Sequence, residues 1–148
     1  MPNQQEKKIV PYSKEQMFDL VSDIDSYKEF LPWCNDSKII SRKKNNPDKE
    51  VLTADLEIGY DQFVYTYRSE VHLSNDKDYI YVKNVDGPFH YLKNKWNFTE
   101  INESSCEIEF EIDFELNVSF FDILMKKFFD LAFKKMVDAF LNRAQEIY

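Results

Sequence analysis

Side chains capable of metal or nucleophilic chemistry are few and far apart in this sequence. There are two cysteines, Cys34 and Cys106, and two histidines, His72 and His90. The cysteines lack the spacing of metal ligands, and two histidines supply a zinc site or a Ser-His-Asp triad poorly. We therefore expect no metal site. In a reducing compartment both thiols should be free and dispensable for function.

Charge and glycine content argue against binding to phosphate groups. The formal net charge is −8, and phosphate-dominated binding draws on clustered Lys and Arg. The basic run Arg42-Lys43-Lys44 is interpreted as a solvated hairpin. Only two glycines occur, Gly59 and Gly87, too few for a phosphate-cradling loop. We expect no binding to DNA.

Aromatic and methionine side chains are abundant in this sequence. The 148 residues include 13 Phe, 9 Tyr, 2 Trp and 4 Met, more aromatic bulk than the core of a plain domain requires. Flexible Met beside Phe suits an adaptable apolar lining. We therefore predict that Met125, Phe129, Phe133 and Met136 line a ligand cavity. The alternative is that such residues only fill the core, and a continuous internal cavity would decide between the two.

The C-terminal segment from Ser119 to Tyr148 positions that lining. Its apolar residues return at helical spacing, and neither Gly nor Pro interrupts it. Ser119 and Asp122 suggest a capping box at its start. A helix of this length runs roughly 40 Å, so it needs a large apolar partner surface.

The N-terminal segment predicts one strand and two short helices. Gln5–Val10 is typical of an edge strand. Ser13 with Gln16 three residues later forms a capping-box pattern that opens the first helix. Asp25 or Ser26 could cap the second.

Between these segments the apolar residues alternate with a period of two, which is typical of strands. Hairpin-length loops join them, so the sheet should be antiparallel. In the last strand an acidic row alternates with the apolar residues, and we interpret it as a solvated outer face. The whole pattern predicts an α+β fold with about seven strands wrapped around the C-terminal helix, in one domain over residues 1–148. The six strands expected after Asp36 are Ile39–Lys43, Val51–Ile58, Asp61–Leu73, Tyr79–Val85, Leu92–Ile101 and Cys106–Val118.

Several short motifs together resemble a known family. They are Val10-Pro11-Tyr12-Ser13, Met17-Phe18-Asp19-Leu20-Val21, Phe30-Leu31-Pro32-Trp33-Cys34, Val85-Asp86-Gly87-Pro88-Phe89 and Val137-Asp138-Ala139-Phe140. In this order they resemble the coenzyme Q-binding branch of the START-like superfamily, over nearly the whole chain. Its bacterial members are often named ribosome association toxins or oligoketide cyclase/lipid transport proteins. The resemblance implies a helix-grip fold, a curved antiparallel sheet around a C-terminal helix.

The resemblance implies three functions. The first is a non-catalytic chaperone for an apolar ligand, ubiquinone or a related isoprenoid lipid, that supports respiration. The second is a ribosome association toxin that binds the large ribosomal subunit and blocks subunit association. The acidity of the chain opposes contact with ribosomal RNA, so this would need a local patch or ribosomal proteins.

The third is a polyketide cyclase-like enzyme, which needs an acid or a base in the cavity. The candidates are Asp86, His90, Tyr65, Tyr67 and Arg68. We interpret Asp86 as a turn residue and Arg68 as an outer-face residue, and we expect no enzymatic activity.

The expected site is therefore a hydrophobic one, with no catalytic cofactor. Its partners would be a hydrophobic small molecule and, as further candidates, a membrane contacted transiently and the large ribosomal subunit. No apolar N-terminal region or membrane-length apolar stretch occurs, which predicts a cytoplasmic protein, peripheral at most at the inner face of the membrane. The expected ligand-binding residues are Trp33, Phe63, Tyr65, Tyr67, Trp96, Phe110, Phe114, Met125, Phe129, Phe133 and Met136.

Overall fold

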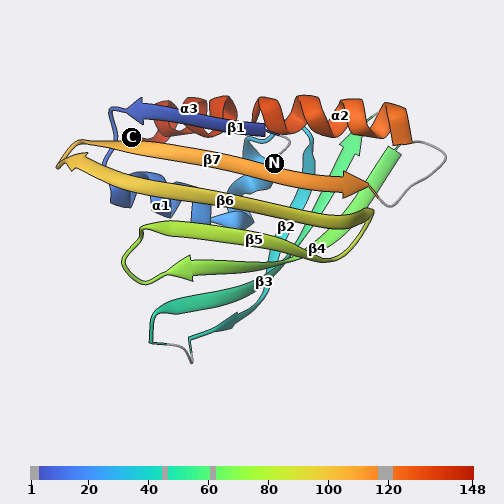
Figure 1. Ribbon diagram of the computed structural model, residues 1–148, viewed down its shortest axis with the longest axis horizontal. Coiled ribbons are helices and arrows are strands. Elements are labelled where there is room, and N and C mark those ends of the chain that lie inside the picture. The colour runs from blue at the N-terminus through green and yellow to red at the C-terminus, as the bar shows by residue number, and fades with distance from the viewer. Residues whose placement is uncertain (1–3, 45–46, 61–62, 117–121) are drawn as a thin grey trace.

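The computed structural model describes residues 4–44, 47–60, 63–116 and 122–148, without the side chains of residues 60, 63 and 122–125. A curved sheet carries helices on its concave side (Figure 1). The elements in chain order are β1 (Gln4–Val10), α1 (Lys14–Ser22), the 3-10 helix η1 (Ile24–Glu29), β2 (Cys34–Lys43), β3 (Lys49–Tyr60), β4 (Phe63–Ser74), β5 (Tyr79–Asp86), β6 (Phe89–Asn102), β7 (Ser105–Leu116), α2 (Asp122–Lys134) and α3 (Met136–Ile147).

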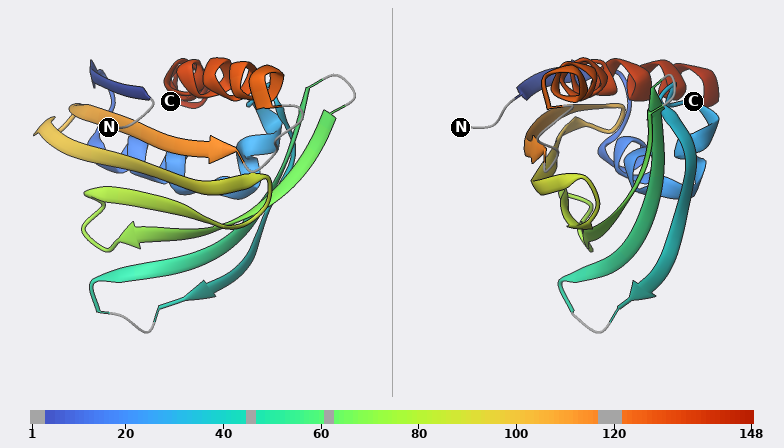
Figure 2. Two further views of the ribbon diagram at one scale, coloured as in Figure 1. Left: turned by 45° about the vertical axis from the view of Figure 1, so that its right-hand side comes forward. Right: turned by 90° about the vertical axis from the view of Figure 1, so that its right-hand side faces the viewer.

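The seven strands pair in the order β1-β7-β6-β5-β4-β3-β2, and every pair is antiparallel. The sheet curls so strongly that its two halves face each other beneath α2 and α3 (Figure 2). This arrangement confirms the predicted α+β helix-grip fold, with about seven strands and two short helices after the first strand.

The two faces of β7 follow the alternation of the sequence. The apolar residues of β7, from Cys106 to Leu116, are all buried on the inner face. The acidic residues lie on the outer face, where Lys7 of β1 approaches Glu107 at 3.8 Å and Glu109 at 3.4 Å. The acidic row is thus partly neutralised by its neighbouring strand.

The capping box of α1 is present as predicted. Ser13 Oγ accepts a hydrogen bond from Gln16 N at 3.0 Å, and Ser13 N donates to Gln16 Oε1 at 2.9 Å. The expected cap of the second helix was wrong, because η1 begins after Asp23. Asp25 is engaged elsewhere, since its carboxylate accepts from Ile39 N at 2.9 Å and so ties η1 to β2.

Strand β2 begins at Cys34, well before the expected start at Ile39. Its pairing with β3 contains irregularities between Cys34 and Asp36 and between Ile39 and Ser41. Because each irregularity shifts side chains from one face to the other, the period of two is lost and the strand is hidden in the sequence.

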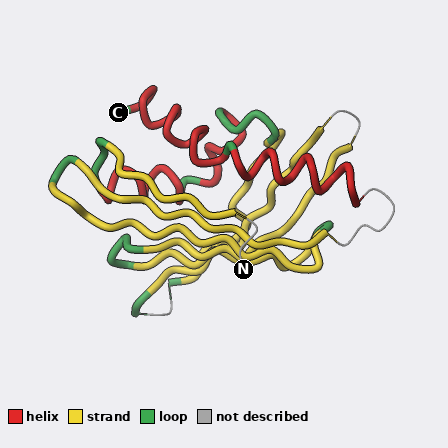
Figure 3. The backbone as a smooth tube through the Cα atoms, turned by 45° about the horizontal axis from the view of Figure 1, so that its top comes forward, coloured by secondary structure: helices red, strands yellow, loops and turns green. Residues whose placement is uncertain are grey.

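The C-terminal helix is divided at Lys135 into α2 and α3, which follow one another on the same side of the sheet (Figure 3). The expected start at Ser119 lies outside the described residues. Lys135 N donates to Leu131 O at 3.1 Å and to Ala132 O at 3.2 Å, so the chain tightens here without Gly or Pro. The division lets each half pack on its own part of the core.

Candidate functional site

An internal cavity of about 50 Å³ lies between the inner face of the sheet and the helices. It is lined by α1, η1 and strands β3 to β7, and α2 and α3 contribute Phe133 and Met136, one on each side of Lys135. Most of the lining is aliphatic or aromatic. This surface is suited to an apolar molecule.

Four of the expected ligand-binding residues line this cavity: Tyr67, Trp96, Phe133 and Met136. They come from β4, β6, α2 and α3, and the curvature of the sheet brings them together. Trp96 is 2% exposed, and its ring centroid lies 5.2 Å from that of Phe140.

Other expected residues are packed beside the cavity without lining it. Phe129 is 1% exposed and stacks its ring 5.8 Å from that of Phe133. Phe114 lies edge-on to Phe133 at 5.0 Å, and Phe110 lies 4.8 Å from Trp96. These rings pack against the lining residues Trp96 and Phe133.

Trp33 and Tyr65 are partly buried against the core. Phe63 lies at the start of β4 and Met125 in the first turn of α2. Their side chains lie outside the described part of the structure.

Sequence reasoning missed three polar residues of the lining: Tyr27, Ser69 and Asn94. Ser69 stands between Tyr67 and Val71 on the inner face of β4, and it is 3% exposed. A polar residue in an otherwise apolar row of a strand was the available signal.

The cavity tyrosines are protonated at neutral pH. Burial raises the pKa of Tyr67, and the neighbouring Cys34 adds a smaller electrostatic effect in the same direction. Burial also raises the pKa of Tyr27, whose hydroxyl donates a hydrogen bond to the backbone oxygen of Val21. Neither phenol can act as a base in this environment.

Among the acid-base candidates, Tyr67 is the one that lines the cavity within the described residues. The Arg68 guanidinium lies on the outer face and binds both carboxylate oxygens of Asp55, at 2.8 and 3.0 Å. Asp86 and His90 are exposed near the β5–β6 turn, and Tyr65 is partly buried. The expected outer-face position of Arg68 is confirmed.

Both cysteines are buried, Cys34 at the start of β2 and Cys106 in β7. Burial raises the pKa of each thiol to about 11, so both are protonated at neutral pH. No group of His, Cys, Asp or Glu side chains suited to a metal ion occurs among the residues that the structure describes. None of the described helices combines the length and apolarity needed to cross a bilayer.

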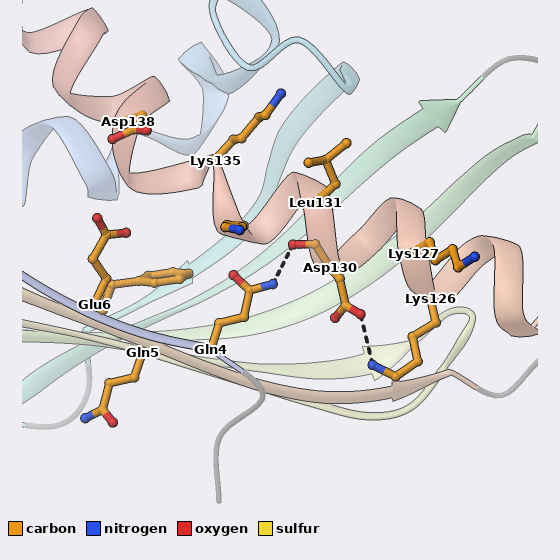
Figure 4. Close-up of a pocket in the computed structure, with 11 residues that line it drawn as sticks. Gln4, Gln5, Glu6, Lys126, Lys127, Asp130, Leu131, Lys135 and Asp138 are labelled. Carbon is orange, nitrogen blue, oxygen red and sulfur yellow. Dashed lines mark hydrogen bonds and ion pairs between the residues drawn. The ribbon is translucent and has the colours of Figure 1, made fainter.

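A second hollow, of about 1130 Å³, lies outside the core between β1 and the C-terminal helices (Figure 4). We call it the lysine groove, because Lys126, Lys127, Lys134 and Lys135 all border it. One of them, Lys126, is paired with Asp130 at 3.0 Å. Glu6, Asp130 and Asp138 also border the groove, so its lysines lie beside carboxylates and its net charge is only slightly positive.

Comparisons with known proteins identify relatives by sequence and proteins with a similar fold. The chain is 34% identical over 148 residues to the protein named ribosome association toxin RatA of Escherichia coli K12, covering 100% of this chain and 90% of that one. It is 35% identical over 147 residues to the mitochondrial coenzyme Q-binding protein COQ10 homolog B of Xenopus laevis, covering 97% of this chain and 58% of the relative. A START superfamily protein of Mycobacterium smegmatis has a similar fold, with a TM-score of 0.79, 16% identity and coverage of 98% of both chains.

The family of this chain is shown by a match to a family model that covers most of the sequence. Residues 10–141 match the family described as polyketide cyclase/dehydrase and lipid transport. The resemblance identified from short motifs is thereby confirmed. The chain belongs to the polyketide cyclase/dehydrase and lipid transport family, and its fold is that of the START superfamily.

Proposed function

We propose that this protein binds an apolar small molecule, ubiquinone or a related isoprenoid lipid, and acts as a non-catalytic lipid chaperone that supports respiration. The observation that carries the proposal is the cavity between sheet and helices, lined by Tyr67, Trp96, Phe133 and Met136. The named coenzyme Q-binding relative supports the choice of ligand.

The cavity must widen to admit such a ligand. Sites for drug-sized molecules measure about 300–1,000 Å³, whereas this cavity measures about 50 Å³. Phe133 and Met136 flank the division at Lys135, so a change of angle between α2 and α3 would move both side chains away from the sheet. We propose that the ligand enters on this side.

The non-catalytic part of the proposal rests on the lining. Proton transfer needs a group whose pKa lies near the working pH. The pKa of Tyr67 is raised away from that range, and neither a carboxylate nor a histidine is found in the described lining. The described lining is thus suited to holding a molecule and offers no carboxylate or imidazole as a general base.

The direct test is organic extraction of the purified protein followed by mass spectrometry. We expect an isoprenoid quinone or a similar lipid at less than one molecule per chain. An empty protein that also takes up no quinone from liposomes would contradict the proposal.

The lysine groove favours a second candidate function, binding of the large ribosomal subunit. Relatives are named ribosome association toxins, and the net charge of −8 opposes RNA binding except where cations are gathered. Lys127 and Lys134 are exposed and border the groove. They could meet phosphate groups without an overall basic charge.

This candidate is tested by sedimentation with large subunits at rising salt. Charge reversal of both residues, K127E with K134E, should abolish cosedimentation, because a few phosphate contacts supply most of such binding. The matched control is K43E with K44E, which changes the charge equally at the exposed end of β2. Equal loss in both double variants, or no cosedimentation of the wild type, would contradict a role for the groove.

A further inference from the structure

The cavity contains a buried hydroxyl with no partner. Ser69 lines the cavity from β4, is 3% exposed, and its Oγ forms no hydrogen bond within the described part of the chain. A buried polar group is normally paired, because an unpaired one forfeits its hydrogen bonds to water. The hydrogen-bond partner of Ser69 Oγ must therefore be supplied by a molecule that occupies the cavity.

Asn94 is a second polar residue of the lining, and the nitrogen of its side-chain amide is hydrogen-bonded. Asn94 of β6 is 8% exposed, and its Nδ2 donates to the backbone oxygen of Glu111 at 3.0 Å. A backbone oxygen only accepts, so the nitrogen must face Glu111, which leaves the amide oxygen as the acceptor end of this side chain. Asn84 of β5 differs, because its amide bonds Phe89 O at 3.3 Å and Leu92 N at 2.7 Å.

The lining also restricts the charge of its occupant. The polar residues of the described lining, Tyr27, Tyr67, Ser69 and Asn94, are all neutral. A carboxylate or phosphate placed here would lose its hydration without gaining a cation, and that cost is large. Fatty acids and phospholipids therefore do not fit with their head groups inside.

We propose that the cavity receives the neutral, oxygen-bearing head of an amphipathic lipid, and that Ser69 is its hydrogen-bond partner. A carbonyl oxygen of the head would accept from the Ser69 hydroxyl, and a hydroxyl of the head could donate to the side-chain oxygen of Asn94. The hydrocarbon tail stays outside this polar pair. This inference rests on the proposed function and adds the orientation and the chemical class of the ligand.

The competing occupant is a water molecule. A cavity of about 50 Å³ has room for a water that could bridge two polar groups. A structural water at Ser69 would leave lipid binding independent of the serine, so the two occupants give opposite results in a binding experiment.

The experiment compares two probes on the full chain by isothermal titration calorimetry. The first is a benzoquinone with a hexyl chain, and the second is hexylbenzene, which has the tail and a ring without the oxygens. In Ser69→Ala we expect the quinone affinity to fall about tenfold, the usual effect of one hydrogen bond in a dry site, and the hexylbenzene affinity to stay unchanged.

The matched control is Ser74→Ala. Ser74 is also buried and lies on β4, but its Oγ accepts from Asp78 N at 2.8 Å and Tyr79 N at 3.0 Å and lies outside the cavity lining. This variant should lose stability and keep both affinities. Unchanged quinone affinity in Ser69→Ala, or an equal loss for both probes, would overturn the inference while leaving the proposed function intact. Binding of neither probe to the wild type would refute both.

Discussion

Phe140 links the C-terminal helix to the rest of the core. It is 1% exposed, and its ring lies 5.3 Å from those of Tyr27 and Phe30 and 5.2 Å from that of Trp96. Met136, one turn earlier, is partly exposed and lines the cavity. Phe140 therefore serves core packing, whereas Met136 is placed to contact a ligand.

Substituting them should separate stability from affinity. Phe140→Ala should lower the free energy of unfolding by about 3–5 kcal/mol, because a fully packed ring is lost and a void remains. Met136→Ala should cost less, since an existing cavity already deprives it of some contacts, but should weaken quinone binding. Urea unfolding and quinone titration of both variants provide the measurement. Equal losses of stability, or unaltered quinone affinity in Met136→Ala, would show that the ligand lies elsewhere.

Gly87 adopts a backbone conformation that residues with a side chain rarely adopt. Its φ is +140°, where a side chain is strained, and an added Cβ would lie 2.4 Å from Cβ of the cavity residue Tyr67. An added Cβ at Gly59 would meet Asn35 Nδ2 at 2.6 Å, but Asn35 is an exposed side chain that can move.

Gly87→Ala should therefore destabilise the protein more than Gly59→Ala does. We expect a loss of about 1–3 kcal/mol from backbone strain, with more if Tyr67 cannot shift, and a smaller loss at Gly59. Thermal unfolding of the two variants checks the order. The reverse order would mean that the β5–β6 turn yields more readily than the β3 position.

At the scale of elements, β3 and β4 are joined on their outer face by the ion pair of Asp55 and Arg68. The hydrogen bonds from Arg68 are the main cause of a pKa of Asp55 below its usual value of 3.8. Because the folded state then binds protons less readily than the unfolded state, the pair contributes fully above the unfolded pKa. Its contribution disappears as the pH falls through the folded pKa.

Asp55→Asn should consequently lose stability at neutral pH, by less than about 1 kcal/mol because the pair is largely solvated. The difference from the wild type should shrink toward pH 3. Urea unfolding of both proteins at pH 7 and at about pH 3 provides the comparison. A difference that stays constant with pH would show that charge is not the cause.

How far the sequence predicted these elements depended on the regularity of each one. The inner and outer faces of β7 were predicted residue by residue, because its alternation is unbroken from Cys106 to Leu116. The start of β2 was not predicted, because two irregularities reverse the side chains along it. The division at Lys135 was invisible too, since a continuous apolar face and the absence of Gly and Pro predict one helix.

The candidate site was predictable in kind but only in part by residue. Apolar spacing identified Tyr67, Trp96, Phe133 and Met136, which line the cavity. It could not tell them from Phe129, whose ring has the same chemistry but lies in solid packing. That difference depends on how far the sheet curls, which is set by contacts between strands and not by any local pattern.

At the scale of the whole molecule, the fold separates an apolar interior from a surface with an uneven distribution of charge. The chain carries a net charge of −8, yet lysines slightly outnumber carboxylates in one groove next to α2, which is bordered by Lys126, Lys127, Lys134, Lys135, Glu6, Asp130 and Asp138. Because α2 also contributes Phe133 to the cavity, one helix borders both candidate sites. A ligand that moved α2 would also shift the lysine groove.

The central claim is that a lipid occupies the cavity between the sheet and the C-terminal helices. Trp96 lines that cavity, and Trp33→Phe would leave it as the only tryptophan in the chain. The decisive measurement is the fluorescence of Trp96 in this variant during titration with an alkyl benzoquinone, which quenches tryptophan at close range. We predict a saturable loss of emission at about one quinone per chain, because the ligand occupies one site between the sheet and the helices. Quenching that only rises linearly, as for tryptophan free in solution, would contradict it.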